Sequence, residues 1–397
     1  MKMTGNSRMQ SLILATTLII SIGVCFVSSA SADPLPPQEY PFPYSARPFP
    51  FLLDSSGKVL SKIEVLSKYG TGATGINDAG QVAGWFLTTA GSARTRAFIT
   101  GPNGSGITEL GTLGGNNSRA TGINDAGQVM GWSTTATMNP GAPHGFITAP
   151  NGVGMTDLGT LDKGLEYYPT SINTIGQVVG WALTYGGDPA FITGPNGAGM
   201  TRLGTPSGVY SIPYGINDAA QVVGRYTTGA GYSHAFITGP DGVGMTDLGT
   251  LGGDRSVAYG INDAGQVVGW STTAAGDYHA FITGPDGMGM IDLGTLGGSN
   301  SVAYGINDAG QVVGWSLTGA GNHHAFITGP NGMGMTDFTS LAELPPGYVM
   351  TDAIGINNKG QILVAATIPE PQSYALMIAG LGLLGFVVWR QKSESRI

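Results

Sequence analysis

Histidine is the side chain best suited to acid–base or metal chemistry, and all five histidines of this sequence lie at or beside one position of a repeated pattern. They are His144, His234, His279, His323 and His324. Equivalent positions of a repeat protein can converge on one axis, where imidazoles would bind a metal ion. Two repeats, however, have Arg96 and Pro189 at this position, and neither coordinates a metal in the ordinary way. The pattern therefore favours hydrogen bonding at a strand edge, with no metal ion and no cofactor.

Five aspartates recur in the phrase Asn-Asp-Ala-Gly or a close variant of it, namely Asp78, Asp125, Asp218, Asp263 and Asp308. A glycosidase needs two carboxyl groups that face one cleft. Turn residues of successive repeats are expected to lie apart by symmetry, so these aspartates do not supply such a pair. The sequence also lacks a calcium-loop spacing, a serine nucleophile elbow and a phosphate loop. These observations predict that the chain is not an enzyme.

The alternative is a carbohydrate-active enzyme, a glycoside hydrolase or lyase, that uses carboxylates outside the repeated phrase. The candidates are Glu166, Asp188 and Glu343. This alternative requires two of them to share one funnel at the spacing of a glycosidase pair.

The third and fourth repeats depart most from the others, and their departures define the candidate ligand site. Its residues are Glu166, Tyr167, Tyr168, Arg202, Tyr210, Arg225 and Tyr226. Arg202 replaces an aspartate of the other repeats, and Arg225 replaces a tryptophan. Exposed tyrosines beside an arginine can stack on sugar rings or anchor a protein partner. Relaxed selection on a scaffold repeat would give the same pattern, so both interpretations stay open.

These residues are carried by seven copies of a repeat whose most regular phrase is Gly-Ile-Asn-Asp-Ala-Gly-Gln-Val-Val-Gly-Trp. Its isoleucines are Ile76, Ile123, Ile172, Ile216, Ile261, Ile306 and Ile356, so the period runs from 44 to 50 residues. Each unit contains four short runs rich in β-branched and aromatic residues. In the sixth unit they cover residues 303–307, 311–315, 324–328 and 334–338. Four strands in about 45 residues are typical of a β-propeller blade.

The two ends of the repeat region each supply half of a further unit. Residues 50–66 follow the pattern of the last two strands, and residues 354–366 follow that of the first two. The sequence therefore predicts an all-β fold, a seven-bladed propeller whose closing blade is shared by both termini. Residues 307–310 favour a hairpin with a type I turn and a G1 bulge. The glycine of each Gly-Trp pair predicts close packing between blades.

Both ends of the chain have the composition of targeting segments. Residues 1–32 resemble a secretory signal peptide, with a basic start, an apolar helix and Ala30-Ser31-Ala32 before the expected cleavage site. Residues 33–49 are proline-rich and are expected to form a linker. Residues 374–389 form an apolar run that predicts a transmembrane helix, and the basic tail after it is expected to face the cytoplasm.

The segment 368–397 contains Pro369-Glu370-Pro371, a glycine-bearing apolar run that predicts a helix, and a basic end with Arg390 and Lys392. In these features it closely resembles the PEP-CTERM sorting signal of Gram-negative bacteria. The resemblance implies recognition and cleavage by a membrane-embedded exosortase in an organism that makes exopolysaccharide. It also implies a transient membrane anchor, followed by release to the cell surface or the medium.

The motif His-Ala-Phe occurs in full at 234–236, 279–281 and 324–326, and with one substitution at 96–98, 144–146 and 189–191. Because of this motif, residues 50–367 resemble the bacterial extracellular HAF repeats, which are named for it. This resemblance implies a secreted repeat protein, and the family has no known catalytic residues to carry over.

Charge and cysteine content narrow the function further. Residues 33–389 contain 12 Lys and Arg against 24 Asp and Glu, which argues against nucleic acid as a partner. The single cysteine, Cys25, lies in the predicted signal peptide, so the exported body has no disulfide. The sequence thus predicts a non-catalytic binding or extracellular-matrix protein of the cell envelope. Its expected partners are the exosortase and either exopolysaccharide or another envelope protein.

Overall fold

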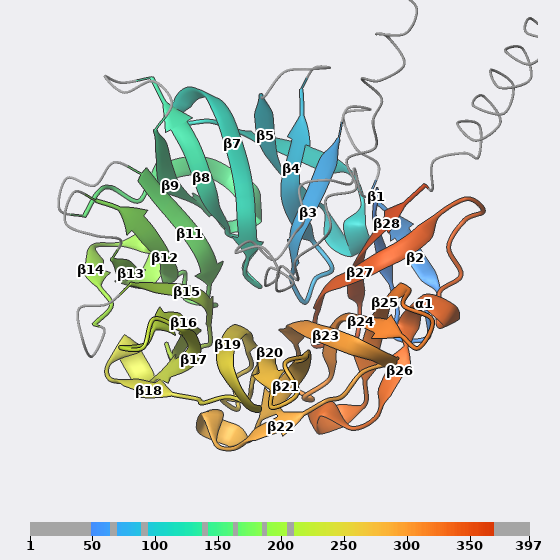
Figure 1. Cartoon of the computed structure of the whole chain (residues 1–397). Coiled ribbons are helices and arrows are strands. Elements are labelled where there is room, and N and C mark those ends of the chain that lie inside the picture. Colours follow the sequence, from blue (N-terminus) through green and yellow to red (C-terminus); the bar gives the residue numbers. More distant parts are fainter. Residues whose placement is uncertain are drawn as a thin grey trace, which may run out of the picture. The chain divides into compact units, whose positions relative to one another are not determined.

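The computed structural model describes residues 49–63, 70–88, 94–136, 142–161, 166–184, 189–204 and 210–368. These residues form seven four-stranded antiparallel sheets arranged as blades around one axis, which confirms the predicted seven-bladed propeller (Figure 1). No helix within these ranges is long and apolar enough to cross a membrane. The predicted signal peptide (1–32), the linker up to residue 48 and everything after Ile368 lie outside the described residues.

Six blades are continuous in sequence, and each begins with the strand nearest the axis. Blade 1 contains β3 (Thr71–Ile76), β4 (Val82–Leu87), β5 (Thr95–Thr100) and β6 (Ile107–Gly111). Blade 2 contains β7 (Gly114–Ile123), β8 (Val129–Thr135), β9 (Pro143–Ala149) and β10 (Val153–Asp157). Blade 3 contains β11 (Glu166–Ile172), β12 (Val178–Leu183), β13 (Ala190–Thr193) and β14 (Met200–Arg202).

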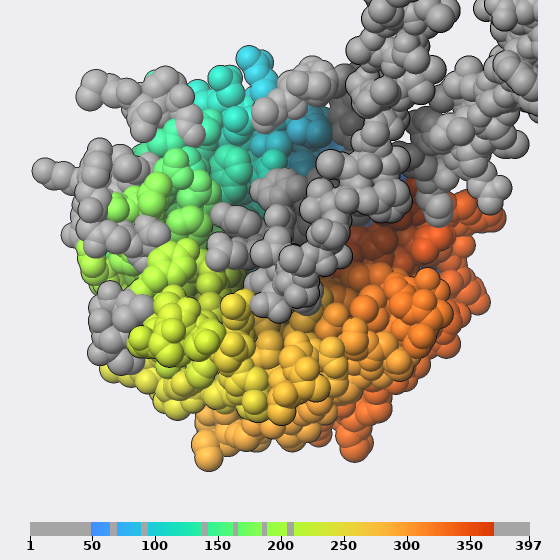
Figure 2. Space-filling model, viewed as in Figure 1, coloured from blue at the N-terminus to red at the C-terminus, as the bar shows by residue number. Residues whose placement is uncertain are grey.

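Blades 4 to 6 continue the same order around the ring. Blade 4 contains β15 (Ser211–Ile216), β16 (Val222–Thr227), β17 (Ser233–Thr238) and β18 (Met245–Asp247). Blade 5 contains β19 (Gly252–Ile261), β20 (Val267–Thr273), β21 (Tyr278–Thr283) and β22 (Met290–Asp292). Blade 6 contains β23 (Gly297–Ile306), β24 (Val312–Thr318), β25 (His323–Thr328) and β26 (Met335–Asp337). In the space-filling view the colours follow this order from blade to blade (Figure 2).

Blade 7 is built from both ends of the repeat region, as the sequence predicts. Its strands are β27 (Val349–Ile356), β28 (Ile362–Thr367), β1 (Phe49–Leu53) and β2 (Val59–Lys62). The strand β1 pairs antiparallel with β28 over five residue pairs, from Phe49 opposite Ala366 to Leu53 opposite Ile362. This pairing closes the ring without leaving an unpaired edge at the junction.

Two kinds of hairpin meet at one end of every complete blade. In the first, the Gly80 N–H donates to Asn77 O at 2.9 Å and Gly80 has a φ of +70°, which confirms the predicted G1-bulge turn. The second hairpin contains a short 3₁₀ turn, and its Gly104 N–H donates to Gly80 O at 2.9 Å. These turns are η1 (Pro102–Gly104), η2 (Pro150–Gly152), η3 (Pro195–Gly197), η4 (Pro240–Gly242), η5 (Pro285–Gly287) and η6 (Pro330–Gly332).

We call the end of the ring that carries both kinds of hairpin the hairpin face. The connections from the second strand to the third, and from one blade to the next, lie at the opposite end, which we call the loop face. In blade 6, for example, Asn307–Gln311 belongs to the hairpin face and Gly319–Asn322 to the loop face.

The first strand of several blades is longer than the sequence predicts. In blade 6 it starts at Gly297 rather than Ala303, because Gly297 pairs with Thr318 and Ser301 with Ser316 across a bulge. The short helix α1 (Phe338–Leu341) follows blade 6. It places Phe338, which is fully buried, against the closing blade.

The glycine of each Gly-Trp pair is needed for a reason other than the one the sequence suggested. A Cβ atom on Gly84 would lie 2.1 Å from the Gly72 carbonyl oxygen, and one on Gly269 would lie 1.9 Å from Val257 O. Both oxygens belong to the first strand of the same blade. The close approach is therefore within a blade, and the predicted packing of these glycines against the neighbouring blade is wrong.

The hydrophobic core lies between successive blades. The cluster between blades 1 and 2, for example, combines Ala97 and Ile99 with Val129 and Phe146. The equivalent phenylalanine is fully buried in each complete blade, at Phe98, Phe146, Phe191, Phe236, Phe281 and Phe326. Burying such a side chain contributes roughly 1.5–3 kcal/mol, and each blade needs its neighbour to achieve this.

Candidate functional site

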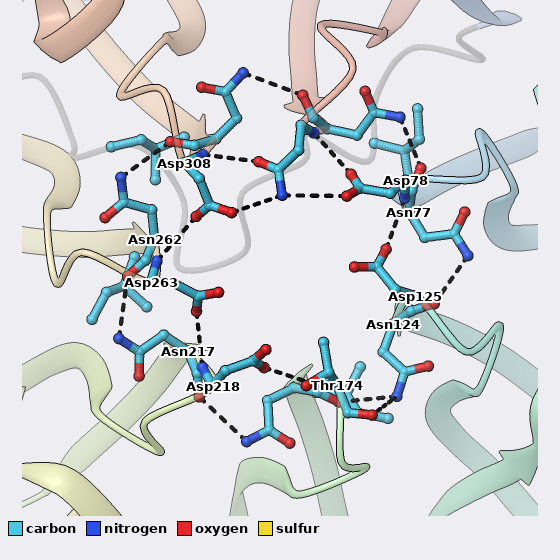
Figure 3. Close-up of a pocket in the computed structure, with 18 of the residues that line it drawn as sticks. Asn77, Asp78, Asn124, Asp125, Thr174, Asn217, Asp218, Asn262, Asp263 and Asp308 are labelled. Atoms are coloured by element: carbon cyan, nitrogen blue, oxygen red, sulfur yellow. Dashed lines mark hydrogen bonds between the residues drawn. The ribbon is translucent and has the colours of Figure 1, made fainter.

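Seven buried asparagines form a closed circle of hydrogen bonds where the first hairpins meet the axis (Figure 3). They are Asn77, Asn124, Asn173, Asn217, Asn262, Asn307 and Asn357, and each is 3–5% exposed. Every Nδ2 donates to the backbone carbonyl of the corresponding asparagine in the next blade, at 2.9–3.3 Å. The bond from Asn357 to Asn77 closes the circle at 2.9 Å.

Each asparagine is also fixed within its own hairpin. Asn77 Nδ2 donates to Gln81 Oε1 at 2.9 Å, while the Gln81 N–H donates to Asn77 Oδ1 at 2.9 Å. The other six blades repeat this pair of bonds. These asparagines were not among the candidate residues. The signal that could have identified them is their presence in all seven repeats, including the two most degenerate ones.

The residues that follow the asparagines form a second circle, which contains the five repeated aspartates. Their carboxylates, together with the Asn358 amide, accept backbone N–H bonds from the preceding blade at 2.8–3.1 Å. Thr174 takes the aspartate position in blade 3, and the N–H of Asp125 makes no such bond to it among the described residues. The second circle is therefore interrupted at one point.

The aspartates surround a cavity of about 200 Å³ on the axis of the hairpin face (Figure 3). The expectation that they lie apart is wrong, because the hairpins of the innermost strands converge on the axis of a ring. Partial burial raises the pKa of Asp125 and Asp263, and neighbouring carboxylates reinforce the effect. In the part of the chain that the structure describes, no group of three His, Cys, Asp or Glu is placed to hold a metal ion.

The repeated histidine forms an ion pair or hydrogen bond with an aspartate on the outer strand of its own blade. Distances from His Nδ1 to Asp Oδ2 are 2.8–2.9 Å in the pairs His144–Asp157, His234–Asp247, His279–Asp292 and His324–Asp337. In blade 1 the corresponding pair is Arg96 Nε and Glu109 Oε1, at 3.1 Å. The expected hydrogen-bonding role of this position is confirmed.

This pairing explains one of the departures of blade 3. Blade 3 has Pro189 in place of the histidine and Arg202 in place of its aspartate. Since the proline leaves an aspartate without a partner, the change at residue 202 removes an acceptor that the blade no longer needs. Arg202 lies exposed on β14, the outermost strand of the blade.

In the first strands of blades 4 to 6, tyrosines bond to residues of the second strands. The Trp270 and Trp315 indole N–H groups donate to the hydroxyls of Tyr259 and Tyr304, at 3.3 and 3.1 Å. In blade 4, Arg225 Nε donates to Tyr214 Oη at 3.2 Å. Arg225 therefore takes over the donor role of the tryptophan it replaces, and it is as buried as Trp315.

Blades 1 to 3 differ at the same positions, because Thr74, Thr121 and Thr170 replace the tyrosines. Their tryptophans, Trp85, Trp132 and Trp181, are only half-buried. The Arg119 guanidinium carbon lies 4.2 Å from the Trp85 ring centroid and 5.6 Å from that of Trp132. We call the surface formed by these tyrosine or threonine positions of the first strands and the tryptophan or arginine positions of the second strands the inner wall. In blades 1 to 3 it presents aromatic surface and hydrogen-bonding groups together.

The structure brings together two of the three candidate residues of β11. The Tyr168 hydroxyl donates to Glu166 Oε2 at 2.6 Å, and the Tyr168 ring stacks on Trp181 with centroids 4.5 Å apart and planes at 21°. Tyr167 is fully buried, and its hydroxyl bonds to the backbone of Leu161. The expectation of an exposed tyrosine at 167 is wrong, because successive residues of a strand point to opposite faces.

The candidate residues of blade 4 form a separate group. The Arg225 guanidinium lies 5.7 Å from the Tyr210 ring centroid, and Arg225 Nη1 donates to Ser233 Oγ at 3.0 Å. Tyr226 donates its hydroxyl to Asp247 Oδ2 at 3.1 Å and therefore belongs with the His234–Asp247 pair. Burial and the Asp247 carboxylate raise the pKa of Tyr226 to about 12, so this hydroxyl stays a donor.

The carboxylates of the enzyme alternative do not share a blade. Glu166 opens β11 in blade 3, whereas Glu343 follows α1, where its N–H donates to Gly57 O at 2.9 Å on the closing blade. Blades 3 and 7 are not neighbours in the ring. Asp188 lies outside the described residues.

One further titratable pair lies between blades 6 and 7. His323 stacks on Trp315 at 4.2 Å, and its Nδ1 lies 2.9 Å from Thr351 O, so this nitrogen carries a proton. His323 Nε2 is 3.9 Å from Asp352 Oδ1. Burial raises the pKa of Asp352, and the neighbouring His323 opposes this shift.

Solved structures of similar fold include a prolyl endopeptidase, TolB and a lyase. A prolyl endopeptidase structure has a TM-score of 0.53 at 11% identity, with 74% of this chain and 46% of that chain covered. TolB from Acinetobacter baumannii has a TM-score of 0.43 at 11% identity, with coverages of 72% and 64%. An oligogalacturonate lyase in complex with manganese has a TM-score of 0.47 at 10% identity, with coverages of 74% and 87%.

The chain thus spans less than two thirds of the prolyl endopeptidase and TolB chains. At these identities the likeness shows the fold alone. It nevertheless corrects the prediction that the chain is not an enzyme, because a propeller of this kind occurs in a prolyl endopeptidase. The fold and its repetition are therefore no argument against catalysis.

Sequence comparison identifies the end of the chain. No curated protein matches the chain. Residues 367–392, however, match the PEP-CTERM protein-sorting motif. This motif is the recognition signal of exosortases, and it implies export and passage through a membrane-anchored state before release to the cell surface or the medium. The chain is a seven-bladed β-propeller whose end matches the PEP-CTERM protein-sorting motif, and this motif implies export.

Proposed function

We propose that this propeller is a glycan-binding component of the Gram-negative envelope or extracellular matrix, and that its ligand is exopolysaccharide. The observation that carries the proposal is the stack of Tyr168 on Trp181, with Glu166 bonded to the tyrosine hydroxyl. Aromatic rings pack against the C–H faces of sugars, and a neighbouring carboxylate accepts hydrogen bonds from sugar hydroxyls.

The surroundings of this stack support a site longer than one sugar ring. The half-buried tryptophans of blades 1 and 2, with Arg119 between them, continue the aromatic surface along the inner wall. The small threonines of these blades leave more of the tryptophans accessible than the tyrosines of blades 4 to 6 do. A polymer can use such a row of modest contacts cooperatively.

The targeting segments complete the proposal. We infer that residues 1–32 direct export, that 33–49 form a linker and that 374–389 cross the inner membrane, with Arg390 and Lys392 on the cytoplasmic side. Exosortase then acts near Pro369-Glu370-Pro371 and releases the repeat region 50–367 with its linker.

The test is a glycan-array screen of the released body, residues 33–368, followed by titration of the best acidic and neutral polysaccharides. We expect Tyr168→Ala to weaken binding at least tenfold, and Glu166→Gln to weaken it less. The matched control is Arg202→Asp, which restores the residue of the other repeats on the outer strand and should leave binding unchanged.

The same samples distinguish the competing functions. Equal binding by the parent protein and Tyr168→Ala, or no binding to any polysaccharide, would refute the proposal. Shortening of the polysaccharide during incubation would support the carbohydrate-active alternative instead. Capture of an envelope protein in place of a glycan would identify that protein as the partner.

A further inference from the structure

Both chain ends of the propeller leave from its loop face. The strand β28 starts at the hairpin of Asn357 and Gly360 and ends at Thr367, at the opposite end of blade 7. The strand β1 begins there as well, because Phe49 pairs with Ala366. The sorting signal, which starts at residue 367, is therefore attached to the loop face.

The distance from this exit point to the predicted anchor is short. Seven residue steps separate Thr367 from Tyr374, the first residue of the apolar run. A fully extended chain gains at most about 3.6 Å per residue, so these steps span at most about 25 Å. An anchored propeller must consequently keep the loop-face end of blade 7 within that distance of the start of the apolar run.

Charge does not decide between the two faces. The described hairpins carry eight aspartates and two lysines, which are Asp54, Asp78, Asp125, Asp218, Asp241, Asp263, Asp286, Asp308, Lys58 and Lys359. The loop-face ends of the blades carry Arg94, Arg119 and Arg255, but also Glu166, Asp254 and Asp277. Both faces therefore carry carboxylates, and the orientation follows from the short tether at blade 7.

We infer that the anchored protein turns its loop face toward the membrane and its hairpin face outward, and that cleavage of the sorting signal uncovers the loop face. For glycan binding, this inference rests on the function proposed above. A large polysaccharide would reach the Tyr168 stack only after release. Sorting would then activate the protein as well as determine its destination.

The single cysteine of the sequence makes this orientation measurable. Cys25 lies in the predicted signal peptide, and after its replacement by serine the full chain has no thiol. Ala320 and Ala309 are both exposed residues of blade 6, the first in a loop-face turn and the second in the hairpin-face turn. Ala320→Cys and Ala309→Cys thus form a matched pair next to the closing blade.

The experiment compares the labelling rate of each thiol by a maleimide that carries a 5-kDa polyethylene glycol. The full chain in lipid vesicles is measured beside the released body, and N-ethylmaleimide serves as a small reagent that reaches both faces. We expect Ala320→Cys to react at least fivefold more slowly in the anchored state with the large reagent. Ala309→Cys should react equally fast in both states.

Equal slowing of both thiols, or of neither, would overturn the inferred orientation. A full chain that fails to float with the vesicles would overturn it as well, because the anchor would be missing. Glycan binding is not read in this assay. If the proposed ligand is wrong, the labelling ratio therefore keeps its expected value while the array screen fails.

Discussion

Blades 4 to 6 and blades 1 to 3 use the same two positions of the inner wall in different ways. In blades 5 and 6 a tyrosine hydroxyl accepts from a buried tryptophan, and blade 4 keeps the bond with Arg225 as donor. In blades 1 to 3 threonine replaces the tyrosine, and the tryptophan remains half-buried. The comparison shows that departures from the repeat fall into two classes. Some departures preserve the hydrogen bond to the tyrosine hydroxyl with a different donor side chain. Others remove the tyrosine and leave the neighbouring tryptophan more exposed to solvent.

We expect the largest loss of stability when ring closure is removed, because blades 1 to 3 and blades 4 to 6 both depend on it. Deletion of residues 33–68 removes β1 and β2 and leaves β28 with an unpaired edge. We expect the remaining chain to lose cooperative unfolding, because blades 6, 7 and 1 lose the core that holds them together. Thermal unfolding followed by circular dichroism measures this. A truncated chain that melts cooperatively at the parent temperature would show that the split blade does not close the ring.

A smaller loss of stability distinguishes blades 4 to 6 from blades 1 to 3 directly. Tyr259→Thr gives blade 5 the residue of blades 1 to 3, and it both empties a packed site and leaves the buried Trp270 N–H without its acceptor. We expect a loss of about 3 kcal/mol in the free energy of unfolding. Tyr259→Phe, which removes only the acceptor, should cost about 1 kcal/mol.

The control for this prediction is a substitution in blades 1 to 3, where threonine replaces the tyrosine. Thr121→Ser keeps the hydroxyl that donates to Pro169 O and should cost about 1 kcal/mol or less. Denaturant titration of the three variants gives the ranking. If Tyr259→Thr and Thr121→Ser cost the same, the two halves of the wall are equivalent and the comparison fails.

The first hairpins allow a finer test, because one of them lacks glycine. Ala220 has a φ of +55°, whereas Gly265 at the same position of the next blade has +74°. We expect Gly265→Ala to cost about 1–2 kcal/mol in backbone strain. It should cost somewhat more in practice, since the new Cβ would lie 2.7 Å from Asp286 N.

The reverse change, Ala220→Gly, should recover less than the strain, because glycine gains entropy in the unfolded chain. Equilibrium denaturation measures both variants against the parent. A neutral Gly265→Ala would contradict the G1-bulge geometry that all seven hairpins share.

The smallest effect concerns pH and the circle of aspartates. Burial raises the pKa of Asp263 in the folded state above its value in the unfolded chain. The protonated carboxyl therefore contributes to the free energy of unfolding at low pH, and this contribution is lost as the pH rises through the folded-state pKa. Asp263→Asn should therefore raise the melting temperature slightly at pH 7, with no gain at pH 3. Asn358 shows that an amide preserves the bond, because its Oδ1 accepts the Asp308 N–H at 2.9 Å. A variant less stable than the parent at pH 7 would contradict the prediction.

The architecture was predictable because period, turn residues and alternation all agree. The phrase Asn-Asp-Ala-Gly predicts a hairpin, and the four runs of β-branched and aromatic residues in each repeat predict a four-stranded blade. The half-units at residues 50–66 and 354–366 predict that both termini share the closing blade. The longer first strands and the helix α1 were not predictable, since their pairing depends on contacts with partner strands that local composition does not specify.

The candidate site is harder to predict, because a single departure from the repeat does not show which cross-strand partner has changed with it. Arg202 follows from the loss of the histidine at Pro189, and Arg225 follows from the hydroxyl of Tyr214. Each of these departures has a structural role only together with its cross-strand partner, which local composition does not identify. The convergence of the aspartates does not follow from the sequence, because spacing gives separation along the chain, whereas a ring brings its innermost turns to one axis.

The asparagine circle has a consequence for how this chain can be cut and rejoined. The bond from Asn357 to Asn77, which joins distant parts of the sequence, is 2.9 Å long, the same as the shortest bond of the asparagine circle between sequential blades. The junction between the last and the first blade is therefore equivalent to the other junctions of the circle, and the circle does not determine in which blade the polypeptide starts. Joining the present ends and opening another loop-face connection would keep every bond of the circle. The tether would then move from blade to blade while the propeller itself stayed the same.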